Sequence, residues 1–251
     1  MNQLNYGFPL SSILLRFFLF FLTLLCIVLL LFSSSNYFLI IISLIVILSY
    51  FYFGIYFFKK SFNEKRKKIL EKMIKIANLK GDETILDLGT GSGFLAIGFA
   101  KFLTNGKTYG IDKYNIKNKN LRSKIFDLIK INFLGNSLKN AKLNAKIENV
   151  ENKCNFISSD ITKSINFSDN YFDIVISSQF FYCIPNKKLE SVFNEINRVC
   201  KKHSKIIIFE SKSFRNWNIN SVKNYFENKG FDIKIIKKTI FKDIYILYGK
   251  T

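Results

Sequence analysis

The feature that most constrains the fold is a glycine-rich string that directly follows a short apolar run. Residues 84–88 (Thr-Ile-Leu-Asp-Leu) have the length and composition of a buried strand. Gly89, Gly91 and Gly93 follow at alternate positions, and residues 94–102 then carry apolar side chains at helical spacing. Strand, glycine-rich turn and helix form the ligand-binding corner of a doubly wound parallel sheet, because glycines let the backbone approach a ligand without an intervening Cβ.

An acidic residue changes the interpretation of this corner. Residues 91–96 alone fit the dinucleotide pattern G-x-G-x-x-A, which favours a nicotinamide-dependent oxidoreductase. Asp87, two residues before the first glycine, instead suits a cationic ligand without phosphate. The string from Ile85 to Gly93 resembles motif I of the class I S-adenosylmethionine-dependent methyltransferases, and residues 135–150 resemble their ubiquinone-biosynthesis-like subgroup. The resemblance implies that Asp87 helps to hold the methionine end of S-adenosylmethionine, with the three glycines beside the cofactor.

The same resemblance assigns cofactor contacts after the next strands. Asp112 ends a predicted strand at 107–111, where the family's carboxylate binds the ribose hydroxyls. Asp160 and Ile161 follow a predicted strand at 154–157, where the family places residues that contact the adenine. Ser177 lies at the carboxyl end of a fourth strand, and ligands bind at that edge of open α/β sheets.

The catalytic residues are not fixed by the sequence. Methyl transfer from a sulfonium requires alignment of donor and acceptor more than a dedicated nucleophile. Tyr182, Ser178 and Gln179, just after the fourth strand, are candidates to contact the acceptor, with Cys183 and Glu210 as further candidates. Relatives often carry a histidine where this chain has Tyr182, so imidazole base chemistry is not expected. The alternative is that the aromatic residues here only line an apolar pocket.

The remaining pattern predicts an α/β fold with a doubly wound, mostly parallel, seven-stranded sheet. A fifth strand is expected at 205–210, a helix at 217–229, and a closing antiparallel hairpin of strands 231–237 and 239–248 joined by a tight Lys-Lys turn. The hairpin favours the methyltransferase family over a dinucleotide domain. Two departures from the family are the Lys- and Asn-rich stretch 114–133, with a candidate extra helix at 121–132, and His203-Ser204 in place of a Pro-Gly-Gly turn.

Two long apolar runs precede this domain. Ile13 to Phe32 and Tyr37 to Phe58 are each long enough to cross a bilayer, and a short turn, Ser33 to Asn36, separates them. We therefore predict a transmembrane helical hairpin at 1–58, a basic juxtamembrane helix at 59–80 and a methyltransferase domain at 81–251. A signal peptide and a pair of buried core helices are the alternatives, but the first run has no convincing cleavage site and neither run has a polar stripe.

Charge predicts the orientation and the partners. Basic residues crowd the exit of the second run (59–68), which favours a cytoplasmic catalytic domain on a two-span membrane anchor. The net charge is +20, but the lysines are scattered, so nucleic acid is not the favoured substrate. The expected partners are the lipid bilayer and a small-molecule or lipid-like methyl acceptor. Four unpaired cysteines and one histidine predict no metal site. A non-catalytic membrane scaffold of the same fold remains an alternative.

Overall fold

The computed structural model describes residues 63–114, 137–211, 218–238 and 244–250, together with scattered single positions from 6 to 52. Residues 1–6 and 70–251 form one compact unit, and residues 7–69 form a second. The predicted membrane runs and the helix predicted at 121–132 lie almost wholly outside the described residues. Over the part of the chain that is described, no helix combines the length and apolar character that crossing a bilayer requires.

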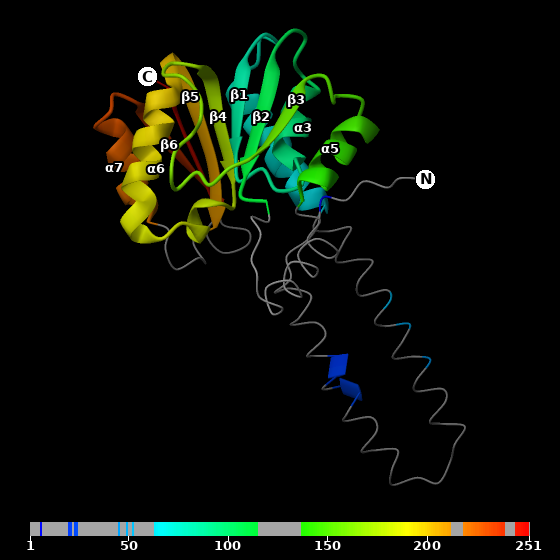
Figure 1. Cartoon of the computed structure of the whole chain (residues 1–251). Helices are drawn as coiled ribbons and strands as arrows, with labels where there is room; N and C mark the ends of the chain where they lie inside the picture. The colour runs from blue at the N-terminus through cyan, green and yellow to red at the C-terminus, as the bar shows by residue number, and fades with distance from the viewer. Residues whose placement is uncertain are drawn as a thin grey trace. The chain divides into compact units, whose positions relative to one another are not determined.

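The larger unit is a seven-stranded sheet flanked by helices (Figure 1). The strand order is β3-β2-β1-β4-β5-β7-β6, with parallel pairing from β3 to β5 and antiparallel pairing of β7 with both β5 and β6. This confirms the predicted α/β class and its antiparallel end. The elements in chain order are β1 (Thr84–Leu88), α3 (Phe94–Ala100), β2 (Lys107–Asp112), α5 (Leu138–Ile147), β3 (Cys154–Ser158), β4 (Phe172–Ser178), the 3₁₀ turn η1 (Phe181–Cys183), α6 (Asn186–Val199), β5 (Cys200–Ser211), α7 (Ile219–Glu227), β6 (Asp232–Lys238) and β7 (Ile244–Lys250).

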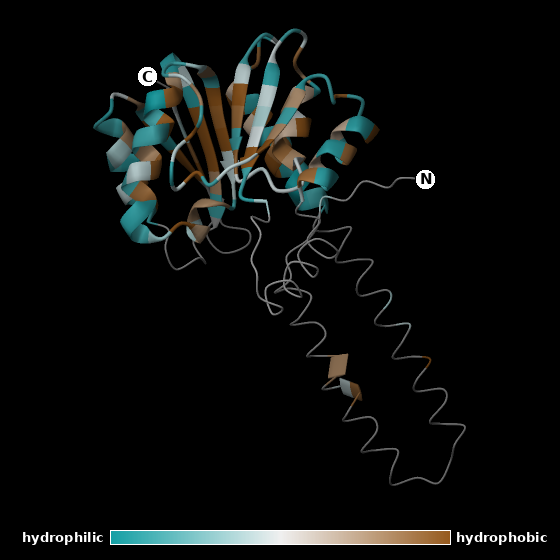
Figure 2. Ribbon diagram, in the orientation of Figure 1, coloured by the Kyte–Doolittle hydropathy of each residue, from teal (hydrophilic) through white to brown (hydrophobic). Residues whose placement is uncertain are grey.

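The helices cover the sheet because each has one apolar face. Helix α6 buries Val192, Phe193, Ile196 and Val199, which recur at helical spacing, and α7 buries Phe226 in the same cluster. Helices α3 and α5 contribute to a separate cluster. Figure 2 shows hydrophobic strands between helices whose outer faces are hydrophilic. The central strands are therefore buried on both sides, as expected for a parallel sheet.

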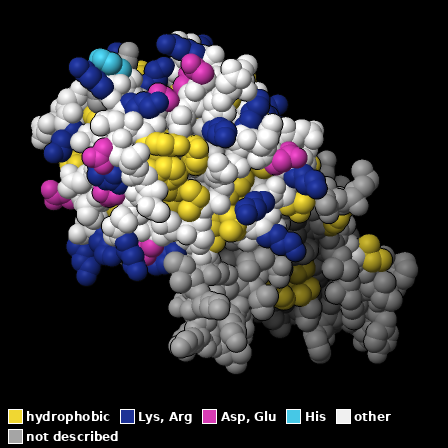
Figure 3. All heavy atoms as spheres, turned by 45° about the horizontal axis from the view of Figure 1, so that its top comes forward, with side chains coloured by type: hydrophobic (Ala, Val, Ile, Leu, Met, Phe, Trp, Pro, Cys, Tyr) yellow, Lys and Arg dark blue, Asp and Glu magenta, His cyan; other side chains and the backbone are white. Residues whose placement is uncertain are grey.

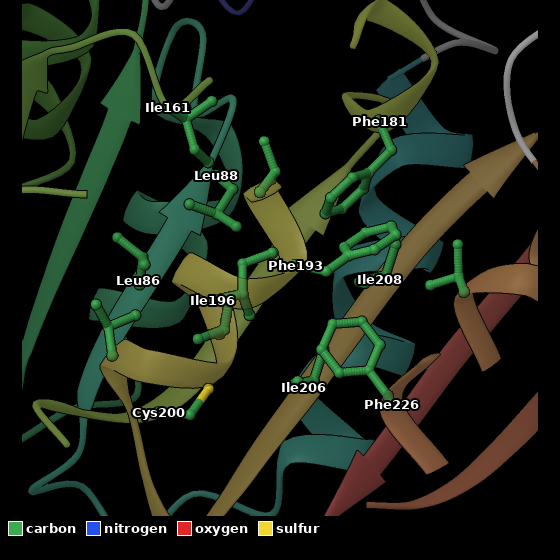
Figure 4. Close-up of a cluster of buried hydrophobic side chains, with 14 of the residues drawn as sticks. Leu86, Leu88, Ile161, Phe181, Phe193, Ile196, Cys200, Ile206, Ile208 and Phe226 are labelled. Atoms are coloured by element: carbon green, nitrogen blue, oxygen red, sulfur yellow. The ribbon is translucent and has the colours of Figure 1, made fainter. Parts of the chain in front are cut away.

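The core under α6 and α7 contains the largest buried cluster of the described residues (Figure 4). Leu86 and Leu88 of β1 point into it, as do Ile206 and Ile208 of β5. Because side chains alternate along a strand, Asp87 points to the opposite face, toward α3. This alternation fixes where the first acidic residue of the site lies.

Two local predictions in the last third of the chain were wrong. Lys237 and Lys238 do not form a tight turn: they belong to β6, and Lys238 pairs with Ile244, so residues 239–243 make the connection. Strand β5 begins at Cys200, directly after α6, and not at Lys205. The pairing of β6 with β7 continues through both lysines, so the strand extends past the position where a Lys-Lys pair suggests a turn.

The unusual His203-Ser204 pair lies in a bulge of β5. The register with β4 shifts between Phe172, opposite Cys200, and Ile174, opposite Lys205. His203 has a φ of 66° there, in the left-handed region. A bulge within the strand thus takes the place of the expected turn. It lies near the start of β5, at the amino edge of the sheet.

Basic side chains are dispersed over the surface. Figure 3 shows Lys and Arg scattered across the visible face, with a few acidic side chains and an apolar patch between them. A single basic stripe, the usual footprint of nucleic-acid binding, does not appear on this face.

Removing a buried ring from the main cluster tests the fold. Phe226 is fully buried and its ring lies 5.4 Å from that of Phe193 and 5.5 Å from that of Phe231. We expect Phe226→Ala to lower the free energy of unfolding by about 3–5 kcal/mol, since it removes contacts and leaves a cavity. Phe102, which is 57% exposed, is the control: Phe102→Ala should change it by less than about 0.5 kcal/mol. Equal effects in denaturant titrations would contradict this packing.

Candidate functional site

The glycine-rich turn is held from beneath by a buried carboxylate. Asp87 is 1% exposed, and its Oδ2 accepts hydrogen bonds from the hydroxyl of Thr90 (2.6 Å) and the N–H of Ala96 in α3 (3.1 Å). Burial raises the pKa of Asp87 to about 7, although the bonds from Thr90 and Ala96 act in the opposite direction. Asp87 therefore ties strand, turn and helix together.

The turn itself follows a path that favours glycine. Gly89, Gly91 and Gly93 have φ values of 70°, 54° and 84°, in the left-handed region. The N–H of Gly91 donates to Oδ2 of Asp112 at the end of β2 (2.8 Å), and the hydroxyl of Tyr114 donates to the Gly91 carbonyl (2.8 Å). The ends of β1 and β2 are thus joined through Gly91. The backbone of this turn is exposed to a cavity.

Gly89 also lies directly against an aromatic ring. A Cβ at Gly89 would stand 2.2 Å from Cδ2 of Phe180, so the ring occupies the space where any side chain would begin. Phe180 follows β4, and its ring therefore closes the glycine corner from the side of the next strand. Glycine is required here by contact as well as by backbone conformation.

A cavity of about 610 Å³ opens at the carboxyl edge of β1 and β2. This size falls within the usual range of small-molecule sites, and the position is where ligands bind in open α/β sheets. Its lining combines backbone, two carboxylates, two lysines and apolar side chains: Gly89, Gly91, Asp112, Lys113, Tyr114, Asp160, Ile161, Thr162, Gln179, Phe180, Tyr182, Cys183, Ile184, Pro185 and Lys188.

One carboxylate of the lining is held by an ion pair. Oδ2 of Asp160 accepts from Nζ of Lys113 (2.8 Å), while Oδ1 accepts from the N–H (3.1 Å) and hydroxyl (2.7 Å) of Thr162. The hydrogen bond from Lys113 is the main cause that lowers the pKa of Asp160 to about 2. Asp160 is therefore ionised and fixed in orientation at neutral pH.

The segment that carries Phe180, beside the glycine turn, is anchored by a second buried carboxylate. Glu210, at the end of β5, is fully buried, and its Oε1 accepts from the N–H groups of Phe180 (2.6 Å) and Phe181 (2.7 Å). Its Oε2 has no hydrogen-bond partner among the described residues. Burial raises the pKa of Glu210 to about 7. Glu210 thus sets the position of Phe180 over Gly89.

The structure brings most of the predicted site residues to this cavity. Of the predicted cofactor and acceptor residues, those on the lining are Gly89, Gly91, Asp112, Asp160, Ile161, Gln179, Tyr182 and Cys183. Five others are not on it, among them Glu210, which accepts hydrogen bonds from the backbone of Phe180 and Phe181. Asp87 is buried and holds the turn through its hydrogen bonds to Thr90 and Ala96. Gly93 and Ser178 are not among the residues that line the cavity. Ser177 is fully buried, and its hydroxyl donates to the carbonyl of Leu88 (3.0 Å) between two strands.

Sequence reasoning did not single out several lining residues. These are Lys113, Tyr114, Thr162, Ile184, Pro185 and Lys188. Lys113, Tyr114 and Thr162 lie within two residues of predicted site residues and could have been found by extending each strand end. Lys188 comes from the first turn of α6, and no local signal marks it. Among the described residues, no group of three or more His, Cys, Asp or Glu side chains could hold a metal ion.

Comparison with known proteins agrees with this site. Residues 114–208 match the model of a methyltransferase domain family. No curated protein matches the sequence. The match supports the predicted enzyme class, a methyltransferase, and it covers residues that follow the glycine-rich turn.

Solved structures share the fold at low sequence identity. A SAM-dependent methyltransferase from Aquifex aeolicus is 20% identical (TM-score 0.52), with 74% of this chain and 97% of that chain covered. Magnesium protoporphyrin IX methyltransferase from Synechocystis, solved with bound SAM, is 16% identical (TM-score 0.53; 74% and 78% covered). The [4+2]-cyclase SpnF is 14% identical (TM-score 0.58; 73% and 80% covered). The domain match and the two methyltransferases agree with the predicted enzyme class and cofactor, whereas the cyclase shows that fold alone does not fix the reaction.

The buried Asp87 predicts a pH dependence of stability. The folded protein keeps a proton on Asp87 up to about pH 7, whereas the unfolded chain releases it near its ordinary pKa of 3.8. The free energy of unfolding should therefore fall as the pH rises between these values, and Glu210 acts in the same direction. From pH 5 to pH 8, the free energy of unfolding of the parent protein should fall by on the order of 2 kcal/mol more than that of Asp87→Asn, which has no carboxyl group to ionise at this position. Denaturant titrations at both pH values measure this difference; Asp82→Asn, at an exposed site, should show none.

Proposed function

We propose that this chain transfers a methyl group from S-adenosylmethionine to an acceptor that enters the cavity beside Phe180, and that its N-terminal segment holds the enzyme on a membrane. The observation that carries the first part is the meeting of Gly89, Gly91, Asp112 and Asp160 around one cavity at the carboxyl edge of the sheet. A turn of exposed backbone flanked by carboxylates suits a nucleoside that carries cationic groups and no phosphate.

The lining residues provide a contact for each part of the cofactor. Asp112 would accept hydrogen bonds from the ribose, since its carboxylate lies at the end of β2 and already orients the Gly91 N–H. Asp160 and Ile161 would border the adenine, and the backbone of Gly89 and Gly91 would lie along the methionine portion. Asp87 would act indirectly, by fixing the turn. This differs from the direct contact that the family resemblance implies for Asp87.

The residues of the chain would act by alignment and exclusion of water. S-adenosylmethionine supplies an already activated methyl group, so the protein has to hold the acceptor atom in line with it. Phe180, Tyr182 and Ile184 form an apolar wall that keeps water from the donor. Glu210 fixes that wall through the N–H groups of Phe180 and Phe181.

Tyr182 is better suited to donate a hydrogen bond than to accept a proton. It lines the cavity, and burial is the main cause that raises the pKa of its hydroxyl, so Tyr182 remains protonated at neutral pH. Gln179 is the other predicted acceptor contact on the lining and also carries no basic group. His203, the only histidine of the chain, lies at the other edge of the sheet. The site therefore favours acceptors that need little help in losing a proton.

Cofactor binding tests the enzymatic proposal. Isothermal titration of the full chain with S-adenosylmethionine should give a dissociation constant in the micromolar range, weakened at least about ten-fold in Asp112→Ala, since charge-assisted hydrogen bonds contribute roughly 1.5–3 kcal/mol. Gly91→Val should abolish binding by blocking the turn. Asp82→Ala, at an exposed position before β1, is the control and should bind normally. Binding of NADH in place of S-adenosylmethionine would favour the oxidoreductase, and binding of neither a scaffold.

The second part of the proposal, membrane attachment, is supported by the apolar runs and by chain connectivity. Residues 1–6 and 70–251 belong to one compact unit, so both ends of the segment 7–69 are joined in sequence to that unit. Tyr6 packs against the ring of Phe94 (5.2 Å between centroids) and its hydroxyl donates to Glu148 (3.3 Å), so Tyr6, which precedes the first run in sequence, belongs to the larger unit. A membrane segment that starts and ends at one unit must cross an even number of times. Two spans with the catalytic domain in the cytoplasm satisfy this requirement.

Extraction with alkaline carbonate tests the anchor. The full chain should remain with the membrane fraction, and the double variant Leu24→Arg, Ile45→Arg should be released, because each arginine in the middle of a span costs about 2.5–3.5 kcal/mol. Ser34→Arg, in the predicted turn, serves as the control and should stay in the membrane. Release of the parent protein by carbonate would reject the two-span anchor while leaving the proposed chemistry intact.

A further inference from the structure

The acceptor side of the cavity is formed by the segment after β4 and the start of α6. Phe180, Tyr182, Ile184 and Pro185 give it apolar and aromatic surface, and Lys188 adds an ammonium group. The methionine side, by contrast, is bounded by the glycine turn. An acceptor that fills this side would therefore meet mainly apolar surface and one basic group.

Lys188 is the lysine of the lining that has no ion pair with a described carboxylate. The cavity contains two carboxylates, Asp112 and Asp160, and two lysines, Lys113 and Lys188. Lys113 is neutralised by Asp160 at 2.8 Å. Nζ of Lys188 donates to the hydroxyl of Thr162 at 3.3 Å, a neutral partner, and no carboxylate of the described residues lies within ion-pair distance of it. Lys188 is half-buried, so its charge is less screened than that of an exposed lysine.

We propose that the methyl acceptor is a largely apolar molecule with an anionic group, a carboxylate or a phosphate, that pairs with Lys188. This inference rests on the proposed function and specifies its substrate class. The apolar body would lie along Phe180, Tyr182 and Ile184, which places the accepting atom near the glycine turn. The anion would replace the weak contact of Lys188 with Thr162 by a charge-assisted hydrogen bond, which is shorter and stronger.

The position of Lys188 argues against a role in holding the cofactor. Its partner Thr162 lies two residues after Asp160, at the end of the cavity where the neutral adenine is proposed to bind. The cofactor's own carboxylate belongs at the opposite end, with its methionine portion beside Gly89 and Gly91. The charge of Lys188 is therefore available to the acceptor.

Matched probes test the assignment. The full chain in nonionic detergent, saturated with S-adenosylhomocysteine, is titrated with 3-phenylpropionate, 3-phenylpropyl phosphate and the uncharged 3-phenylpropanol. At least one anion should bind about ten-fold more tightly than the alcohol, and the advantage should decrease with added salt. The tighter of the two anions identifies a carboxylate or a phosphate acceptor. Lys188→Gln should bind all three probes equally while keeping its affinity for S-adenosylhomocysteine.

The adjacent Lys187 provides the control. It is exposed, lies in the same helical turn and is not part of the lining, so Lys187→Gln should keep the preference for anions. Equal binding of alcohol and anions by the parent protein would overturn the proposal. So would a Lys188→Gln variant that loses affinity for S-adenosylhomocysteine but keeps the preference. If the parent protein does not bind S-adenosylhomocysteine at all, the proposed function fails. The three probes are then titrated in the absence of S-adenosylhomocysteine, and the preference for anions and its loss in Lys188→Gln test the role of Lys188 separately.

Discussion

The hydrogen bonds from Thr90 and Ala96 to the buried carboxylate of Asp87 are the interaction on which the site depends. A glycine-rich turn has high conformational freedom, and it needs an internal anchor to keep one path. Asp87 supplies this anchor where β1, the turn and α3 meet. The cost is a carboxyl group in an apolar environment, which explains why its pKa is raised to about 7.

A second buried carboxylate stabilises the other wall in a similar way. Glu210 receives the N–H groups of Phe180 and Phe181, which would otherwise be unsatisfied at the end of β4. The ring of Phe180 is thereby held against Gly89. The cavity is therefore enclosed between two backbone segments, each fixed by a carboxylate that is not itself on the lining.

Strands and helices were predictable where apolar periodicity is strong. Residues 84–88, 107–111 and 154–157 were expected as strands and lie in β1, β2 and β3, because each is a short segment that carries β-branched, aromatic or leucine side chains. The prediction failed at Lys237-Lys238, where pairing of β6 with β7 continues through residues that locally suggest a turn. It also missed the start of β5, since the bulge at His203 depends on the register with β4.

The sequence by itself determined the order of the motifs, the acids at the strand ends and the glycines of the turn, because these follow from local spacing. Asp112, Asp160 and Ile161 could be placed at one edge since parallel strands end together. Only the tertiary structure decided that Asp87 and Ser177 point away from the cavity, and that Phe180 and Lys188 reach it. The direction of a side chain at a strand end, and the approach of α6 to the loop after β3, depend on packing between segments distant in sequence, which no local pattern encodes.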